Sequence, residues 1–206
     1  MGAEAGLGRG VLRRARTYVS GRPTTQKAGA GVAAALLASA PFGGLSAVPE
    51  PPPETLRLGQ PILVGPYEVV LDQVVELPDL APAVTPEPSQ RVLVLDAHVR
   101  LTGDRPEYAV TLTDHVTVAG GGVTVVGRPG LWFVEDSSPM SSFNPGLTYR
   151  LALAFTTSGP WQGDVVTVTT DLVEFREEDR QTLDPDAWVG RDEVEWQGSL
   201  PLVRRA

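Results

Sequence analysis

The stretch RVLVLDAHVRL at Arg91–Leu101 decides the fold class, because apolar and polar side chains alternate along it. The apolar set is Leu93, Leu95, Ala97, Val99 and Leu101, and the polar set is Asp96, His98 and Arg100. A period of two residues is typical of a β-strand with one buried face. We therefore expect a half-buried strand here.

The same alternation predicts further strands along the chain. Over residues 67–77 it places Tyr67, Val75 and Leu77 on one buried face and Glu76 on the exposed face. Other strands are expected at residues 108–118, 123–126, 131–135, 148–157, 164–175 and 198–203. Three glycines at 120–122 predict a hairpin. Eight or nine short strands with Gly and Pro turns indicate an all-β protein with an antiparallel sandwich.

Several of these strands are joined to short turn motifs. They are LGQP at 58–61 before the strand at 67–75, RVLVLDAHV at 91–99 with TGD at 102–104, and NPG at 144–146 before LALAF at 151–155. In this order they resemble the DUF4352 (telokin-like) family over about residues 57–175. The resemblance implies an immunoglobulin-like β-sandwich on an anchored or exported bacterial protein, and it supplies no catalytic residues. Thr102 departs from the Asn that often precedes the Gly-Asp turn.

Residues 28–49, AGAGVAAALLASAPFGGLSAVP, contain no charged residue. Their length is sufficient, because a helix of roughly 20 apolar residues crosses a bilayer. Residues 1–27 carry six basic side chains and one acidic side chain, an asymmetry that keeps such a tail in the cytoplasm. We therefore predict a single-pass cell-membrane protein, with one N-terminal transmembrane helix at 28–49 and an extracytoplasmic C-terminal domain.

Two other interpretations of residues 28–49 stay open. Ala38-Ser39-Ala40 is an A-x-A site of the kind at which signal peptides are cleaved, although the basic region before it is long and Pro41 adjoins the scissile bond. A stretch rich in Ala and Gly could also be the tail of a soluble protein. The anchor is favoured by the flanking charges.

Composition limits the remaining domains and their partners. EPPPE at 50–54 predicts a Pro-rich spacer over 50–56, followed by one β-sandwich domain over 57–206. The chain has no Cys, which excludes disulfides and thiol chemistry. Residues 28–206 carry 24 acidic and 11 basic side chains, a formal charge of −13. Such a surface repels phosphate backbones, so no nucleic acid partner is expected.

Two loops are the best candidates for contact with a partner. Residues 78–90, PDLAPAVTPEPSQ, hold four prolines, among them Pro82 and Pro86, and are too long for an ordinary hairpin. They predict a mobile flap or a contact loop. Trp161, in the turn at 158–163, either exposes its ring for contact or folds back onto the end of the sandwich. Trp132, on a strand, is expected to pack in the core.

The acidic segment at residues 171–195 has ten carboxylates and three arginines. We interpret it as a solvated strip, with a calcium site as an alternative, and we expect a short helical turn at 184–188. Paired carboxylates of an envelope hydrolase are a further alternative, but the sequence assigns no pair.

The two histidines complete the candidates. His98 is expected to be a solvated cross-strand partner, and His115 could pair with a carboxylate. Nothing in their spacing demands a metal site. We therefore predict no enzyme and no cofactor, but a binding or structural module of the bacterial cell envelope. It is held in the membrane by residues 28–49 and contacts an unknown envelope or membrane protein.

Overall fold

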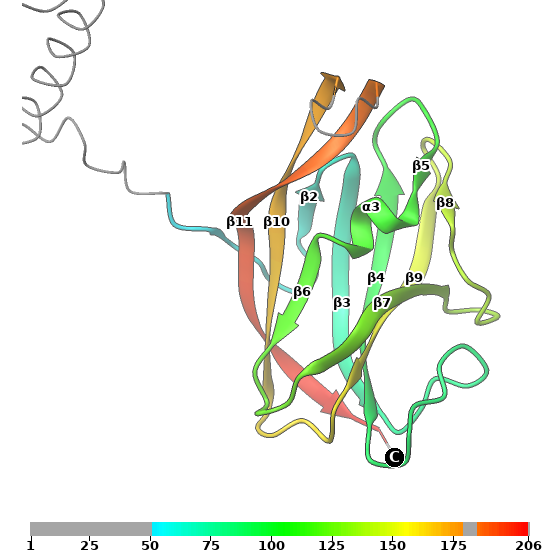
Figure 1. Ribbon diagram of the computed structural model, residues 1–206, viewed down its shortest axis with the longest axis vertical. Helices are drawn as coiled ribbons and strands as arrows, with labels where there is room; N and C mark the ends of the chain where they lie inside the picture. Colours follow the sequence, from blue (N-terminus) through cyan, green and yellow to red (C-terminus); the bar gives the residue numbers. More distant parts are fainter. Residues whose placement is uncertain (1–50, 179–184, 206) are drawn as a thin grey trace, which may run out of the picture. The chain divides into compact units, whose positions relative to one another are not determined.

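The computed structural model describes residues 51–178 and 185–205 (Figure 1). A compact unit begins at Pro52. The predicted tail at 1–27 and transmembrane helix at 28–49 lie outside the described residues. In the part that is described, no helix is both long and apolar enough to cross a membrane.

The unit is built mainly of β-strands. One nine-stranded sheet contains β1 (Glu54–Thr55), β2 (Pro61–Val64), β3 (Tyr67–Leu77), β4 (Arg91–Leu101), β6 (Val116–Ala119), β7 (Val125–Phe133), β9 (Thr148–Thr157), β10 (Val165–Glu178) and β11 (Pro185–Arg204). Its order is β6-β10-β11-β3-β4-β9-β7, with β1 on β11 and β2 on β3. A separate pair is formed by β5 (Glu107–Tyr108) and β8 (Ser142–Phe143).

The sheet curls around the core, so that β6 and β7 lie in front of β3 and β4 (Figure 1). Val116 of β6 and Leu131 of β7 line the same small internal space as Leu71 of β3 and Val99 of β4. The predicted all-β class is confirmed, with most strands in one curled sheet. Pairing is antiparallel as expected, except that β11 runs parallel to both β1 and β3.

The strands predicted at 91–101 and 148–157 are confirmed at their bounds, whereas those predicted at 123–126 and 131–135 form one strand, β7. On β4 the predicted apolar face is buried, with Leu95 and Leu101 fully enclosed. Of the three residues predicted on the exposed face, His98 and Arg100 are exposed, but Asp96 is buried. Its neighbour β9 pairs with it in register over ten residues, from Arg91 opposite Thr157 to Arg100 opposite Thr148. The outer face of these two strands carries the candidate site.

The predicted strand at 108–118 is wrong, because α3 (Ala109–Thr113) interrupts it. Ala109 and Leu112, three residues apart, both enter the core, which a helical turn allows and a strand does not. The glycine hairpin at 120–122 is also wrong. β6 pairs with β10, whereas β7 pairs with β9, so these glycines connect opposite ends of the sheet order.

The C-terminal and N-terminal edges of the domain differ from prediction as well. Pro185–Arg204 is one strand, so the expected helical turn at 184–188 is wrong for the described residues 185–188. The sheet also begins before residue 57, because Glu54 and Thr55 pair with Trp196 and Gln197. The extended spacer predicted over 50–56 therefore ends in a strand of the domain.

A β-bulge in β3 reverses its alternation. The register with β4 shifts between Leu71 and Gln73, which leaves Asp72 as the extra residue. Beyond it Val75 lies opposite Val94 and Glu76 lies opposite Leu93. The predicted faces are therefore wrong after residue 72, since Val75 is on the outer face and Glu76 is on the inner face.

Candidate functional site

The outer face of β4 and β9 carries an apolar patch. Its members, each at most 5% exposed, are Val92, Val94, Ala152 and Ala154. Side chains on the outside of a sheet are normally solvated, so something must cover this patch. The cover is the Pro-rich loop at 78–90, which packs Leu80 and Val84 against it.

Local hydrogen bonds shape the Pro-rich loop. Leu80 and Val84 exchange two backbone hydrogen bonds, each 2.9 Å long. The carboxylate of Asp79 accepts a hydrogen bond of 3.2 Å from the backbone N–H of Ala81. Pro82, which follows a cis peptide bond, is exposed.

A cleft of about 130 Å³ remains between the Pro-rich loop, β7 and the end of β11. Its apolar lining includes Leu77, Leu80, Val94 and Trp132, and its polar lining includes Gln73, Asp96 and Arg205. We call this space the outer-face cleft. An apolar cavity of about 150 Å³ accepts a molecule as large as benzene, so the cleft has room for one apolar side chain.

The bulge in β3 builds the polar edge of the outer-face cleft. It turns Gln73 outward, where its amide N–H₂ donates to the carboxylate of Asp96 at 2.9 Å. Arg150 donates to the same carboxylate at 2.9 Å, and Arg205 donates to the carbonyl oxygen of Gln73 at 3.3 Å. Burial opposes ionisation of Asp96, but the hydrogen bonds from Arg150 and Gln73 outweigh it and lower the pKa. Asp96 is therefore a charged anchor at neutral pH.

Trp132 forms a wall of the outer-face cleft. The sequence predicts it as a core residue, and the structure instead leaves it half-buried on the outer side. Its indole N–H is buried and has no hydrogen-bond acceptor in the described part of the chain. An unsatisfied buried donor costs about 1–3 kcal/mol. A ligand carbonyl that reached this donor would recover part of that free energy.

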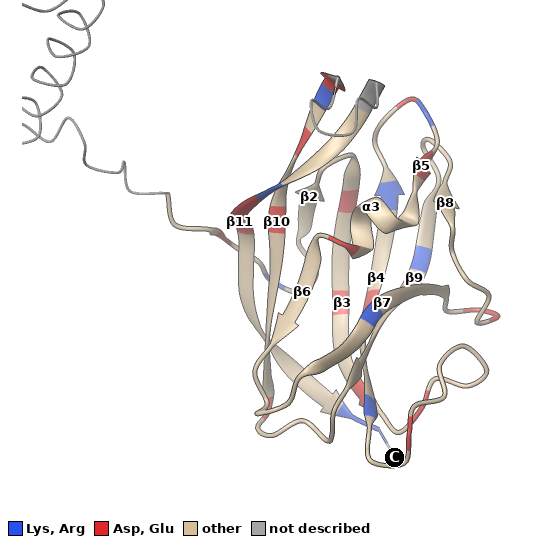
Figure 2. Cartoon of the chain, viewed as in Figure 1, with Lys and Arg blue, Asp and Glu red and all other residues tan. Residues whose placement is uncertain are grey.

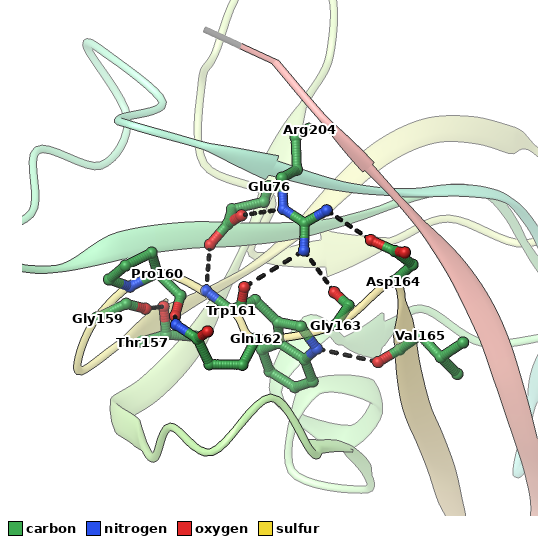
Figure 3. A network of polar contacts seen from close by, with 10 residues as sticks. All are labelled: Glu76, Thr157, Gly159, Pro160, Trp161, Gln162, Gly163, Asp164, Val165 and Arg204. Carbon is green, nitrogen blue, oxygen red and sulfur yellow. Dashed lines mark hydrogen bonds and ion pairs between the residues drawn. The ribbon is translucent and has the colours of Figure 1, made fainter.

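Trp161 does not form part of the surface. It is 4% exposed, so of the two alternatives left open by the sequence the folded-back position is the observed one, and exposure of the ring is wrong. Its backbone N–H donates to the carboxylate of Glu76 at 2.6 Å, and its indole N–H donates to the carbonyl of Val165 at 2.9 Å. Figure 3 shows both contacts.

The other two candidate contact residues lie on the Pro-rich loop. Pro86 is half-buried and Pro82 is exposed, so the loop retains accessible surface.

Glu76, Trp161 and Arg204 make a latch that joins β3, the turn after β9 and the end of β11 (Figure 3). The guanidinium of Arg204 lies 3.4 Å from the carboxylate of Glu76 and 2.8 Å from that of Asp164. Sequence reasoning missed this latch because Glu76 faces inward only as a result of the bulge.

The histidines make ordinary local contacts. His98 is 45% exposed and pairs at 2.8 Å with Asp72, the bulged residue, as expected for a solvated cross-strand partner. His115 lies 3.4 Å from the carboxylate of Asp171. Over residues 51–178 and 185–205, no three His, Asp or Glu side chains are close enough to hold a metal ion.

Comparisons with known proteins add little. No family model matches the chain, and no curated protein matches it in sequence. Among solved structures, the chain is similar to an uncharacterized beta-sandwich protein from Clostridium difficile, with 10% sequence identity and a TM-score of 0.40. The match covers 74% of this chain and 97% of the other. A likeness of this degree carries no argument about function.

Proposed function

We propose that this chain is a membrane-anchored protein of the bacterial cell envelope whose extracytoplasmic, immunoglobulin-like β-sandwich binds another envelope protein. The role is binding rather than catalysis. The contact is made at the outer-face cleft and the Pro-rich loop beside it, and one apolar side chain of the partner enters the cleft.

The anchor is supported by the sequence. Residues 28–49 are uncharged, and the basic tail before them carries the charge asymmetry of a cytoplasmic segment. The domain beyond them is acidic, and export does not require cysteines. These features fit display outside the membrane.

The binding site is supported by one observation, the outer-face cleft between a buried apolar patch and the loop that covers it. Leu80 and Val84 cover the apolar patch, but at the outer-face cleft apolar side chains remain accessible beside the polar edge. Apolar walls with a few positioned polar groups are typical of binding pockets. The polar edge would orient a partner backbone while the walls accept its side chain.

Site-specific photocrosslinking in the native membrane tests this function. A benzophenone amino acid at Pro86, on the Pro-rich loop, should crosslink one protein partner. The same probe at Leu63, a residue of β2 that is 53% exposed, should not. Substitution Ala152→Leu, which fills the cleft, should abolish the Pro86 crosslink without lowering expression.

Two outcomes of this experiment would refute the proposed contact. Ala152 lies in the lining of the outer-face cleft, so a crosslink that survives A152L in a protein with an unchanged melting temperature shows that the cleft is not used. Equal crosslinking from Pro86 and Leu63 would mean that the loop makes no specific contact.

A further inference from the structure

A second hollow lies at the opposite end of the strands, where β10 and β11 project beside the segment that follows β4 (Figure 1). It has a volume of about 460 Å³. Its lining includes Asp104, Arg105, Glu107, Phe175, Glu177 and Trp188. We call it the end groove. It shares no lining residue with the outer-face cleft.

An aromatic pair forms one wall of the end groove. Phe175 of β10 and Trp188 of β11 are direct cross-strand partners, with ring centroids 5.3 Å apart and planes inclined by 61°. Trp188 is held from behind, because a Cβ atom on Gly65 would lie 3.3 Å from its ring. Phe175 is nevertheless 48% exposed. A fixed aromatic ring with an open face is a surface on which cations bind.

Carboxylates from separate segments surround these rings. Asp104 and Glu107 come from the chain after β4, and Glu177 comes from β10. The lining includes one arginine, so acidic side chains outnumber basic ones in it. Figure 2 shows acidic residues on both β5 and the far end of β10. The carboxylates do not converge to the spacing of a metal site in the described residues. They instead line different parts of the end groove, whose volume of about 460 Å³ is large enough for a peptide side chain.

Glu107 is a half-buried carboxylate in the lining of the end groove. Burial raises its pKa, although Trp188 and the positive charge of Arg105 act in the opposite direction. A cation placed beside it would stabilise the ionised form. The groove thus offers an aromatic face and carboxylates that gain from an added positive charge.

We propose that the end groove binds a basic peptide segment, with a guanidinium or ammonium group seated between Phe175 and the carboxylates of Glu107 and Glu177. Charge complementarity selects this occupant, because a neutral sugar would leave the net negative charge of the lining unbalanced. The proposal is independent of the outer-face cleft, and either site can fail alone.

Titration of a fluorescent hexa-arginine peptide tests the proposal. The full-length protein, in a nonionic detergent, should bind it at low salt. Substitution Phe175→Leu should weaken binding by about two- to fivefold, the loss expected for one exposed cation–π contact. Glu107→Gln keeps the shape of the side chain and should weaken binding by about fivefold or more.

Two matched controls separate the groove from the general acidity of the domain. Leu147→Ala removes an equally open apolar side chain, 53% exposed, and Glu193→Gln removes an exposed carboxylate outside the lining. Both should leave the affinity within about twofold of the wild type. Equal losses in the controls would show nonspecific attraction and overturn the proposal. A neutral oligosaccharide that binds in a Phe175-dependent manner while hexa-arginine does not would overturn it too.

Discussion

Removal of the Glu76 side chain should destabilise the domain far more than its place in an alternating strand suggests. Glu76 is 7% exposed, and its carboxylate accepts a hydrogen bond of 2.6 Å from the backbone N–H of Trp161. Glu76→Ala leaves that N–H buried without a partner, which costs about 1–3 kcal/mol, and removes a charge-assisted hydrogen bond. We expect the free energy of unfolding to fall by about 2–4 kcal/mol, a large part of the 5–15 kcal/mol typical of a domain.

Urea unfolding of the full-length chain in nonionic detergent, followed by tryptophan fluorescence, measures this loss. Glu76→Gln keeps an acceptor for the N–H of Trp161 and should lose about 1 kcal/mol. Glu68→Ala, on the outer face of the same strand, is the control and should change the free energy by about 0.5 kcal/mol or less. If Glu76→Ala matched Glu68→Ala, the inward direction of Glu76 and the bulge that causes it would both be wrong.

Two further predictions concern the glycine connection and the cleft. In urea unfolding, Gly121→Ala should lower the free energy of unfolding by about 2–5 kcal/mol, because its Cβ would lie 2.3 Å from the ring of Trp161 at a backbone φ of +61°. The control Gly122→Ala, at φ +64° with its nearest contact at 3.9 Å, should lower it by only about 1–2 kcal/mol. Equal losses would contradict the packing of Gly121 against Trp161. The folded pKa of Asp96 is lowered, so its stabilisation is complete above the unfolded value of about 3.9 and disappears as pH falls through the folded value. The stability difference between the wild type and Asp96→Asn should therefore shrink below about pH 4, and a difference that stayed constant to pH 2 would exclude this role.

The sequence predicts the strands whose alternation is unbroken and fails where a single residue changes the phase. β4 and β9 appear at their predicted bounds because each has one continuous apolar face. The bulge at Asp72 has no marker in composition, since a strand with one extra residue still alternates on either side of it. That one residue reverses the face of Glu76 and Val75 and thereby creates both the latch and the floor of the cleft.

Part of the candidate site can be predicted from the sequence. The prolines identify residues 78–90 as unusual, and Val92 and Val94, on the otherwise polar face of β4, are the signal that something covers that face. The burial of Trp161 could not be predicted, because it depends on Gly120 and Gly121, about forty residues earlier in the chain, lying against its ring. Long-range placement of this kind leaves no local pattern.

Single-cysteine labelling in spheroplasts tests the central claim, display of the domain outside the membrane, most directly. The natural chain has no Cys, so Leu147→Cys, at a position 53% exposed in the domain, and Arg16→Cys in the basic tail each introduce one thiol. A membrane-impermeant maleimide should label L147C in intact spheroplasts and R16C only after lysis. Protection of L147C until lysis would contradict the proposed topology, and with it an envelope partner for this domain.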